Sequence, residues 1–242
     1  MIRIYLTRIL SLNKIPQRIF IFSVLVYLFS EMMSFTLLSQ GAEENRVLTV
    51  AQKMELFFKT VQDYTCEVEQ IFYQDGEENQ RFRFKFYFKR GKKVRIDFFH
   101  PYSSLTILYG ERDKEATVIP FRFMAGLKFR LSIDNPIIRT PAGQSINQTD
   151  MEYFVSFLLK NLGKVKQKMD EFSEDQDQIK FWFWAMDYIN EKDLEKYRIF
   201  ISKRSWLPIR IERYHLDGKP IEVSIIQNYT INTGLQDKLF IP

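Results

Sequence analysis

The alternation of aromatic and basic side chains over residues 81–89 constrains the fold of this chain more than any other feature. Phenylalanine occupies every second position from Phe82 to Phe88. The basic residues between and beside them are Arg81, Arg83, Lys85 and Lys89. A period of two places successive side chains on opposite faces of a β-strand. We therefore expect a strand with one buried aromatic face and one solvated basic face.

The chain beyond residue 63 contains a series of such short strands linked by tight turns. Asp75-Gly76, Gly91 and Asp217-Gly218 are turn signals between them. Connections this short force antiparallel neighbours, because a parallel crossover needs about a dozen residues or more. About nine strands are expected, over Tyr64–Tyr73, Phe82–Phe88, Val94–Phe98, Leu105–Tyr109, Ala116–Ile119, Ile179–Tyr188, Tyr197–Ser202, Pro208–His215 and Ile221–Thr230.

Two helices are expected in addition to the strands. The first precedes the first strand and has one apolar stripe, formed by Val47, Ala51, Met54, Phe58 and Val61. The second begins at the capping box Thr149–Glu152 and continues to Leu162. Between the two strand series, Phe121–Gln148 is apolar but irregular, and its prolines exclude a long helix. A lid is therefore expected within Phe121–Leu162.

Residues 1–41 have the order of an export signal. Basic residues from Arg3 to Arg18 precede the apolar run Ile19–Phe29, and Ser39 and Gly41 stand at −3 and −1 before a possible cleavage site. This order is typical of a signal peptide. Extending the apolar run to Leu38 reaches the length that spans a bilayer, so an uncleaved N-terminal membrane anchor is the alternative. Residues 42–242 are expected to form a single domain in the periplasm.

Charge and reactive residues exclude several functional classes. The formal net charge is +5, but residues 1–41 hold four basic residues and one acidic residue, so the rest is only weakly basic and a nucleic-acid partner is not expected. Cys66 is the sole cysteine, which excludes an intramolecular disulfide. His100 and His215 are the only histidines, and no metal-ligand spacing, nucleophile elbow or phosphate-binding loop is present. We expect no catalytic residue, no metal and no cofactor, and hence no enzyme.

The aromatic strands have two possible interpretations, a filled core or the wall of a cavity. The phenylalanines of Phe82–Phe88 must lie against something apolar. Ile179–Tyr188 is apolar on both faces, with Phe181 and Phe183 on one and Trp182 and Trp184 on the other. Such a strand is covered on both sides, as when a lid or a ligand lies over a sheet. This pattern favours the cavity.

Several segments resemble the Lol-type outer-membrane lipoprotein carriers, the LolA/LolB-like superfamily. Lys85–Pro101 (KFYFKRGKKVRIDFFHP) is similar to their strand–turn–strand signature, although Gly91 stands where the carriers usually have proline. Tyr64–Gln70 (YTCEVEQ) resembles their first strand, and Tyr229–Asn232 resembles their closing strand. An uncharacterised group with the same fold is equally similar, for example at Asn135-Pro136.

The resemblance implies a mainly antiparallel β fold with helices (α+β). In that fold an incomplete β-barrel, or strongly curved sheet, is closed by a helical lid, and an apolar cavity between them holds acyl chains of lipoproteins or lipids. Arg90 corresponds to the arginine that links barrel to lid in the carriers, and is the expected lid latch. The expected cavity residues are Phe82, Phe84, Phe86, Phe88, Phe98, Phe181 and Phe183.

Two functions follow from these observations. The first is a periplasmic carrier that binds acyl chains reversibly and transfers them to the outer membrane. The second is an envelope sensor or scaffold of the same fold, which reads lipidated or misfolded proteins and signals to a partner protein in the inner or outer membrane. A retained anchor would favour the second, because a shuttle must leave the membrane. A monomer is expected in either case.

Overall fold

The computed structural model describes residues 46–110, 114–121, 126–162, 172–187, 189 and 192–242. These residues belong to one compact unit, Glu44–Pro242. The expected signal peptide or anchor over residues 1–41 lies outside the described residues. Among the residues that are described, no helix is both long and apolar enough to cross a membrane.

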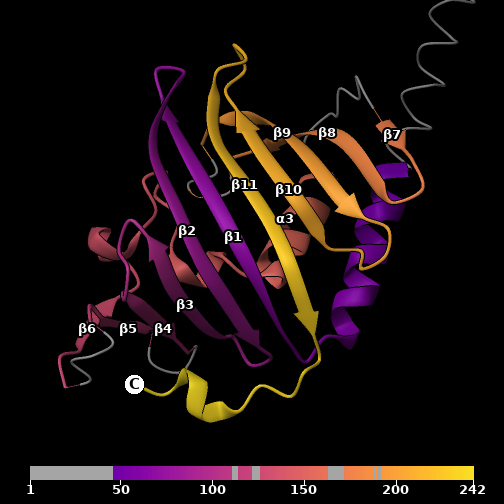
Figure 1. The fold of residues 1–242 in the computed structure, drawn as a ribbon. Coiled ribbons are helices and arrows are strands. Elements are labelled where there is room, and N and C mark those ends of the chain that lie inside the picture. The colour runs from indigo at the N-terminus through magenta and orange to yellow at the C-terminus, as the bar shows by residue number, and fades with distance from the viewer. Residues whose placement is uncertain (1–45, 111–113, 122–125, 163–171, 188, 190–191) are drawn as a thin grey trace, which may run out of the picture. The chain divides into compact units, whose positions relative to one another are not determined.

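One antiparallel sheet of eleven strands dominates the fold (Figure 1). All nine expected strands are present, and two short strands, β6 and β7, were not expected. The strands are β1 (Asp63–Gln74), β2 (Glu77–Lys89), β3 (Lys93–His100), β4 (Thr106–Tyr109), β5 (Glu115–Ile119), β6 (Phe129–Ser132), β7 (Phe172–Glu174), β8 (Gln178–Met186), β9 (Leu194–Ser202), β10 (Pro208–Tyr214) and β11 (Pro220–Ile231).

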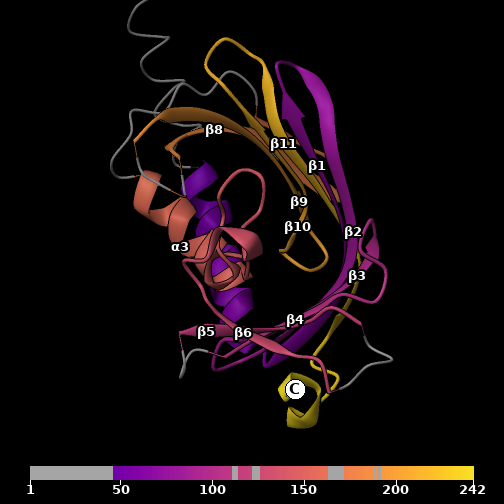
Figure 2. The same ribbon diagram turned by 90° about the vertical axis from the view of Figure 1, so that its left-hand side faces the viewer.

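Two meanders form this sheet, and they meet where the first strand pairs with the last. The order is β6-β5-β4-β3-β2-β1-β11-β10-β9-β8-β7. Val68 of β1 lies opposite Phe84 of β2 on one side and opposite Ile226 of β11 on the other. Because β6 and β7 are its edges, the sheet is not closed. The expected incomplete barrel is therefore confirmed as an open, strongly curved sheet (Figure 2).

The tight turns follow from their residues. Asp75 and Gly76 between β1 and β2 both have positive φ, 54° and 89°, as the central residues of a type I′ hairpin turn require. Gly91 has a φ of 89° between β2 and β3. A residue with a Cβ adopts a φ of this size only at a cost, which explains why glycine stands at positions 76 and 91.

The helices lie inside the curve of the sheet (Figure 2). The first is helical over 46–60, and its predicted apolar stripe is buried, with Val47 and Ala51 at 0% exposure and Met54 at 1%. The second, α3 (Met151–Leu162), is capped by Asp150, whose Oδ1 accepts a hydrogen bond from the Tyr153 backbone N–H at 2.9 Å. The expected cap at Thr149 was therefore one residue too early: its hydroxyl donates to the Ile146 carbonyl at 2.6 Å.

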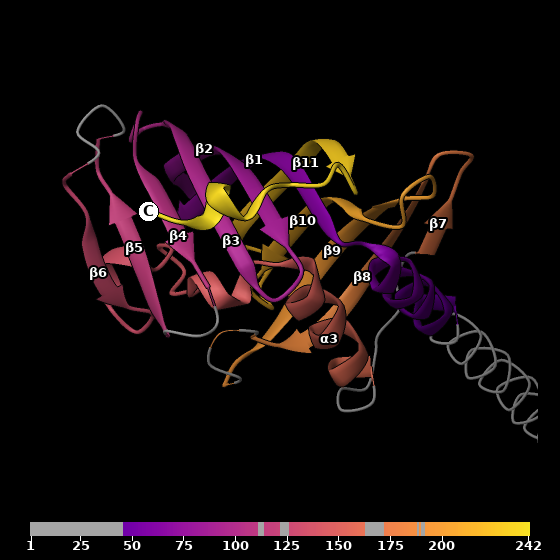
Figure 3. The ribbon, with the colours of Figure 1, turned by 90° about the horizontal axis from the view of Figure 1, so that it is seen from below.

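Short 3₁₀ helices and the C-terminal segment complete the fold. The helices η1 (Pro136–Ile138) and η2 (Ile146–Gln148) lie between β6 and α3. After β11 the chain runs along the sheet to η3 (Asp237–Phe240), next to β3 (Figure 3). Asp63 holds the start of this segment, because its carboxylate accepts backbone N–H bonds from Thr233, Gly234 and Leu235 at 2.8–3.1 Å.

Candidate functional site

A cavity of about 630 Å³ lies between the concave face of the sheet and the segment that precedes and begins α3. The first wall is made by β1–β4 and β9–β11, and the second by η1, η2 and the first half of α3. Its apolar lining from the sheet includes Val68, Phe82, Phe84, Phe86, Ile96, Phe98, Ile107 and Ile226, and Leu105 directly before β4 adds to it. Its apolar lining from the second wall includes Pro136, Ile137, Ile138, Ile146, Met151, Phe154 and Phe157.

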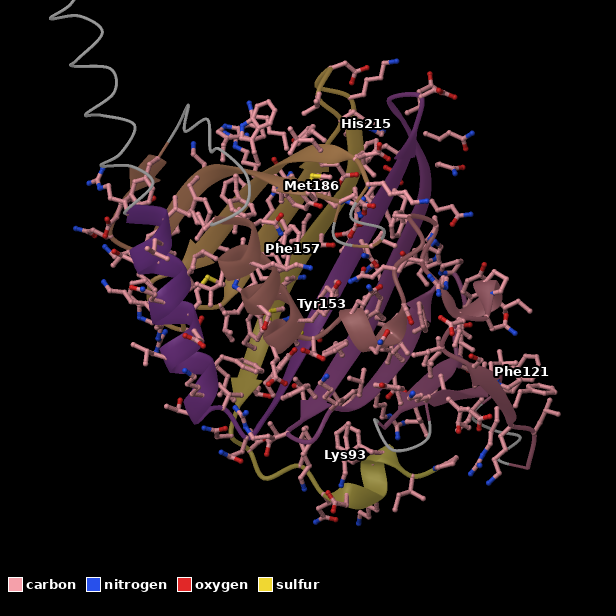
Figure 4. The ribbon with its side chains drawn as sticks, turned by 180° about the vertical axis from the view of Figure 1, so that it is seen from behind. Lys93, Phe121, Tyr153, Phe157, Met186 and His215 are labelled. Carbon is pink, nitrogen blue, oxygen red and sulfur yellow. The ribbon has the colours of Figure 1, made fainter. Side chains whose placement is uncertain are left out.

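The second wall falls within the segment Phe121–Leu162 that was expected to form the lid. Tyr153 and Phe157 of α3 lie over the inner face of the sheet (Figure 4), and both line the cavity. Ile137 in η1 and Tyr102 after β3 also line it, yet they are 79% and 55% exposed. The cavity therefore opens to solvent beside these two residues.

The structure divides the predicted cavity residues into two groups. Four of them line the cavity, namely Phe82, Phe84, Phe86 and Phe98. Three others, Phe88, Phe181 and Phe183, do not, because other parts of the protein cover them. Phe88 packs against Tyr64 and Phe58, with ring centroids 5.1 and 5.6 Å away. Phe181 and Phe183 belong to a core cluster filled by residues of the two helices. Alternation identifies the inner face of a strand but not which part of that face a helix covers.

The two-sided apolar pattern of β8 led us to expect a strand that is covered on both faces, and its outer face is covered in part. Trp182 and Trp184 are half-buried there by cationic side chains of the neighbouring strand β9. Lys196 Nζ lies 4.1 Å from the Trp182 ring centroid, and Arg198 Cζ lies 5.2 Å from it. Cation–π contacts of this kind stabilise aromatic side chains on an exposed face. No ligand is needed to explain the two-sided apolar pattern.

One part of the cavity wall on the sheet is polar and charged, and it was not predicted. Arg213 donates from Nε and Nη2 to the two oxygens of Glu195 at 3.0 and 3.1 Å, and from Nη1 to Glu222 Oε2 at 3.2 Å. Glu222 Oε1 accepts from Gln70 Nε2 at 2.6 Å and from Ser224 Oγ at 2.9 Å. Gln70, Arg213, Glu222 and Ser224 line the cavity, whereas Glu195 is not among its lining residues. We call these five residues the polar cluster.

A signal for the polar cluster was present in the sequence. Arg213 follows Ile211 at a spacing of two on β10, which places both on the concave face. Glu222 of β11 is the register partner of Arg213, and both residues are 4% exposed. A charged residue in phase with the apolar positions of a strand indicates a buried ion pair or a site.

Burial changes the titration of two further residues that line the cavity. It raises the pKa of the Cys66 thiol, so the thiol stays protonated and presents a small apolar surface. It also raises the pKa of the Asp150 carboxyl, although the backbone N–H of Tyr153 opposes this effect. Within the described ranges, no group of three or more His, Cys, Asp or Glu residues is arranged to hold a metal ion.

Arg90 ties the sheet to a helix, but to a different one from that expected. Its Nε donates to the Val61 carbonyl at 2.9 Å and its Nη2 to the Phe58 carbonyl at 2.6 Å. Its guanidinium carbon also lies 5.5 Å from the centroid of the Phe58 ring. The Phe58 carbonyl belongs to the last turn of helix 46–60 and the Val61 carbonyl follows directly after it, where a cation is favoured. The hydrogen bonds found for Arg90 therefore anchor the N-terminal helix rather than the segment 121–162.

No model of a known protein family matches the sequence, and no curated protein matches it. Solved structures do. A LolA superfamily protein from Nitrosomonas europaea shares 12% identity over 81% of this chain and 97% of its own, with a TM-score of 0.41. Lipoprotein LppX from Mycobacterium tuberculosis shares 10% over 79% of this chain and 98% of its own, with a TM-score of 0.49. A DUF1329 family protein from Desulfovibrio piger shares 14% over 81% of this chain and 96% of its own, with a TM-score of 0.45.

One of these three proteins, that from Nitrosomonas europaea, belongs to the superfamily that the sequence motifs resemble. Identities of 10–14% and TM-scores of 0.41–0.49 do not carry a function from those proteins to this one. The geometry of the cavity carries the functional argument instead.

Proposed function

We propose that this protein is a periplasmic carrier that holds acyl chains of lipoproteins or lipids in its cavity for transfer to the outer membrane. The observation that carries the proposal is the cavity of about 630 Å³, lined largely by aromatic and aliphatic side chains under a separate wall of short helices. Its volume is within the roughly 300–1,000 Å³ of small-molecule sites. The order of residues 1–41 supports export.

Apolar burial supplies enough free energy for such a ligand. Each methylene moved from water into an apolar cavity contributes about 0.8 kcal/mol. A chain of about ten methylenes therefore gains on the order of 8 kcal/mol before the cost of immobilising it. The net affinity left after that cost suits a carrier, which must also release its ligand.

Release requires a path out of the cavity, and the exposed lining residues provide one. Tyr102 and Ile137 combine an apolar side chain with high exposure at the opening. Ile137 belongs to η1, which is three residues long and follows an edge strand. A short helix outside the sheet ladder moves at lower cost than a strand within it. We expect the ligand to enter and leave beside η1.

A neutral fluorescent probe tests the proposal together with a variant that fills the cavity. N-phenylnaphthylamine should bind the wild-type protein saturably, with a Kd in the micromolar range. Val68→Trp places a large side chain into the cavity from β1 and should weaken binding by about tenfold or more, because the volume for the probe is lost. Glu69→Trp is the matched control, since the next residue on the same strand points to the convex face.

The comparison between the two variants decides the result. Equal probe binding by Val68→Trp and Glu69→Trp would place the probe elsewhere on the protein. Absence of saturable binding to folded wild-type protein would remove the proposed function altogether. Near-ultraviolet circular dichroism of each variant establishes that the fold is retained.

A further inference from the structure

The polar cluster is costly for a cavity wall that serves acyl chains alone. Arg213, Glu195 and Glu222 are 4–6% exposed. Removing charges from water costs several kcal/mol for each ion, and apolar replacements of buried ion pairs are often as stable or more stable. Neither stability nor the binding of a simple hydrocarbon therefore explains why this buried ion-pair cluster forms part of the cavity wall.

The cluster gives the cavity two chemically different ends. Phe82 on β2 is the register partner of Gln70 and therefore borders the cluster. Phe98 lies one strand farther out, on β3, whereas Arg213 and Glu222 lie on β10 and β11. These strands are on opposite sides of β1 in the sheet. A ligand that matches both ends has an alkyl tail among the phenylalanines and a polar head at the cluster.

The charges of the cluster determine which head fits. Arg213 is its one cation among the described side chains, and it is shared by Glu195, Glu222 and, with its Nη2 3.9 Å from Oδ1, by Asp187. The other charged lining residues are one of each sign, Arg139 and Asp150. Three carboxylates around one guanidinium favour an incoming cation and disfavour an incoming carboxylate or phosphate.

Glu222 also retains capacity to accept a hydrogen bond. A carboxylate offers about four lone-pair positions, and in the described structure Glu222 accepts one bond each from Arg213, Gln70 and Ser224. A protonated amine supplies several donors on a compact charge. It would therefore reach Glu222 from the cavity without displacing the existing partners.

We infer that the cavity selects amphiphiles that carry a protonated amine beside the alkyl chain, and that Glu222 in the polar cluster binds this amine. This inference rests on the proposed function, because it assumes that the alkyl chain occupies the cavity. The inference goes beyond the proposed function by naming the head group of the ligand and the residue that recognises this head group.

Displacement of bound N-phenylnaphthylamine by ligands with one chain length and different heads tests the inference. Dodecylamine, dodecanol and dodecanoate are compared at concentrations that leave the near-ultraviolet circular dichroism unchanged. Dodecylamine should bind wild-type protein more tightly than dodecanoate by about tenfold or more, the ratio that one hydrogen bond to a charged group supplies. Glu222→Gln should reduce this ratio to about threefold or less, with little effect on dodecanol.

Glu212→Gln is the matched control for the removal of a buried glutamate. Glu212 is 3% exposed and accepts a hydrogen bond from the Tyr214 hydroxyl at 2.9 Å, but it lies on the opposite face of β10 from Arg213 and does not line the cavity. This variant should keep the wild-type ratio. If both variants lose the preference for dodecylamine over dodecanoate, this preference comes from general electrostatics rather than from Glu222.

Each result for wild-type protein is decisive, even if Glu222→Gln does not fold. Equal affinity for dodecylamine and dodecanoate, or preference for dodecanoate, overturns the inference while the proposed function stands. Probe binding without displacement by any of the three ligands also overturns it. If neither the probe nor any ligand binds, the proposed function fails and the inference fails with it.

Discussion

Asp150 links the local structure of α3 to the cavity, because its carboxyl caps the helix and also lines the wall. Burial raises the pKa of this carboxyl above that of an exposed aspartate. The folded state therefore binds the proton more tightly than the unfolded state. The resulting stability is fully present below the unfolded pKa of about 3.9 and is lost as the pH rises through the folded pKa. At neutral pH the charge on Asp150 is a cost.

Asp150→Asn should remove this cost without removing the cap. Asparagine is as good an N-cap as aspartate, so at pH 7 the variant should equal or exceed the wild-type free energy of unfolding. Asp150→Ala, which loses the cap, should cost about 1 kcal/mol. Urea denaturation at pH 7 and near pH 4 measures the free energy of unfolding of both variants. Any stability that Asp150→Asn gains over the wild-type protein should shrink at the lower pH. Equal destabilisation by Asn and Ala at pH 7 would show that the charge itself stabilises the fold.

At the scale of elements, Arg90 joins the β2–β3 hairpin to the end of helix 46–60. Arg90→Leu removes two hydrogen bonds to the Phe58 and Val61 carbonyls, and should cost about 2–3 kcal/mol. Amide hydrogen exchange should then accelerate in helix 46–60, while α3 and the cavity wall keep their protection. Arg90→Lys should have an intermediate effect, since one ammonium does not reproduce the planar fork.

Arg83→Leu is the control for this prediction. Arg83 is an exposed arginine on the convex face of β2, the strand that leads into the Arg90 turn, so its loss should leave the exchange of helix 46–60 unchanged. If Arg90→Leu behaves like Arg83→Leu, the hydrogen bonds of Arg90 contribute nothing to the attachment of the helix. If it instead accelerates exchange in α3, Arg90 acts on the lid as the sequence resemblance implied.

The sequence predicted the elements better than it predicted how they cover one another. Alternation over Phe82–Phe88 and the Asp75-Gly76 turn are local signals, and both were right because a strand and a type I′ turn depend on adjacent residues. The edge strands β6 and β7 have four and three residues, too few for a period to emerge. They form because a neighbouring strand supplies hydrogen bonds, which is a tertiary effect.

The candidate site could be predicted only in part for the same reason. Phe84 and Phe98 line the cavity and Phe183 does not, although all three lie on the apolar face of a strand. The difference is that helix residues cover Phe183, including Phe157, whose ring centroid lies 6.0 Å away. The position of a helix on a curved sheet is set by the whole packing arrangement and is not encoded in any strand alone.

For the whole molecule, the seam between β1 and β11 determines whether the cavity exists. The Gln70–Glu222 hydrogen bond crosses this seam and joins residues 152 positions apart. The cavity wall and its polar cluster are therefore complete only when the first and last strands have paired. In the proposed carrier, the sheet ladder holds one wall of the binding surface in place, and the second wall, outside that ladder, is the part expected to move.

The central claim is that the cavity holds an alkyl-chain ligand. Native mass spectrometry tests it most directly, on protein that is purified from the cell envelope of its own host without detergent exchange. We predict the mass of the folded polypeptide together with a discrete additional mass that organic solvent extracts as an alkyl-chain compound. Val68→Trp, prepared in parallel, should lack that mass, and Glu69→Trp should keep it. Wild-type protein that carries only its own mass, and takes up no alkyl-chain compound when one is added, would contradict the account.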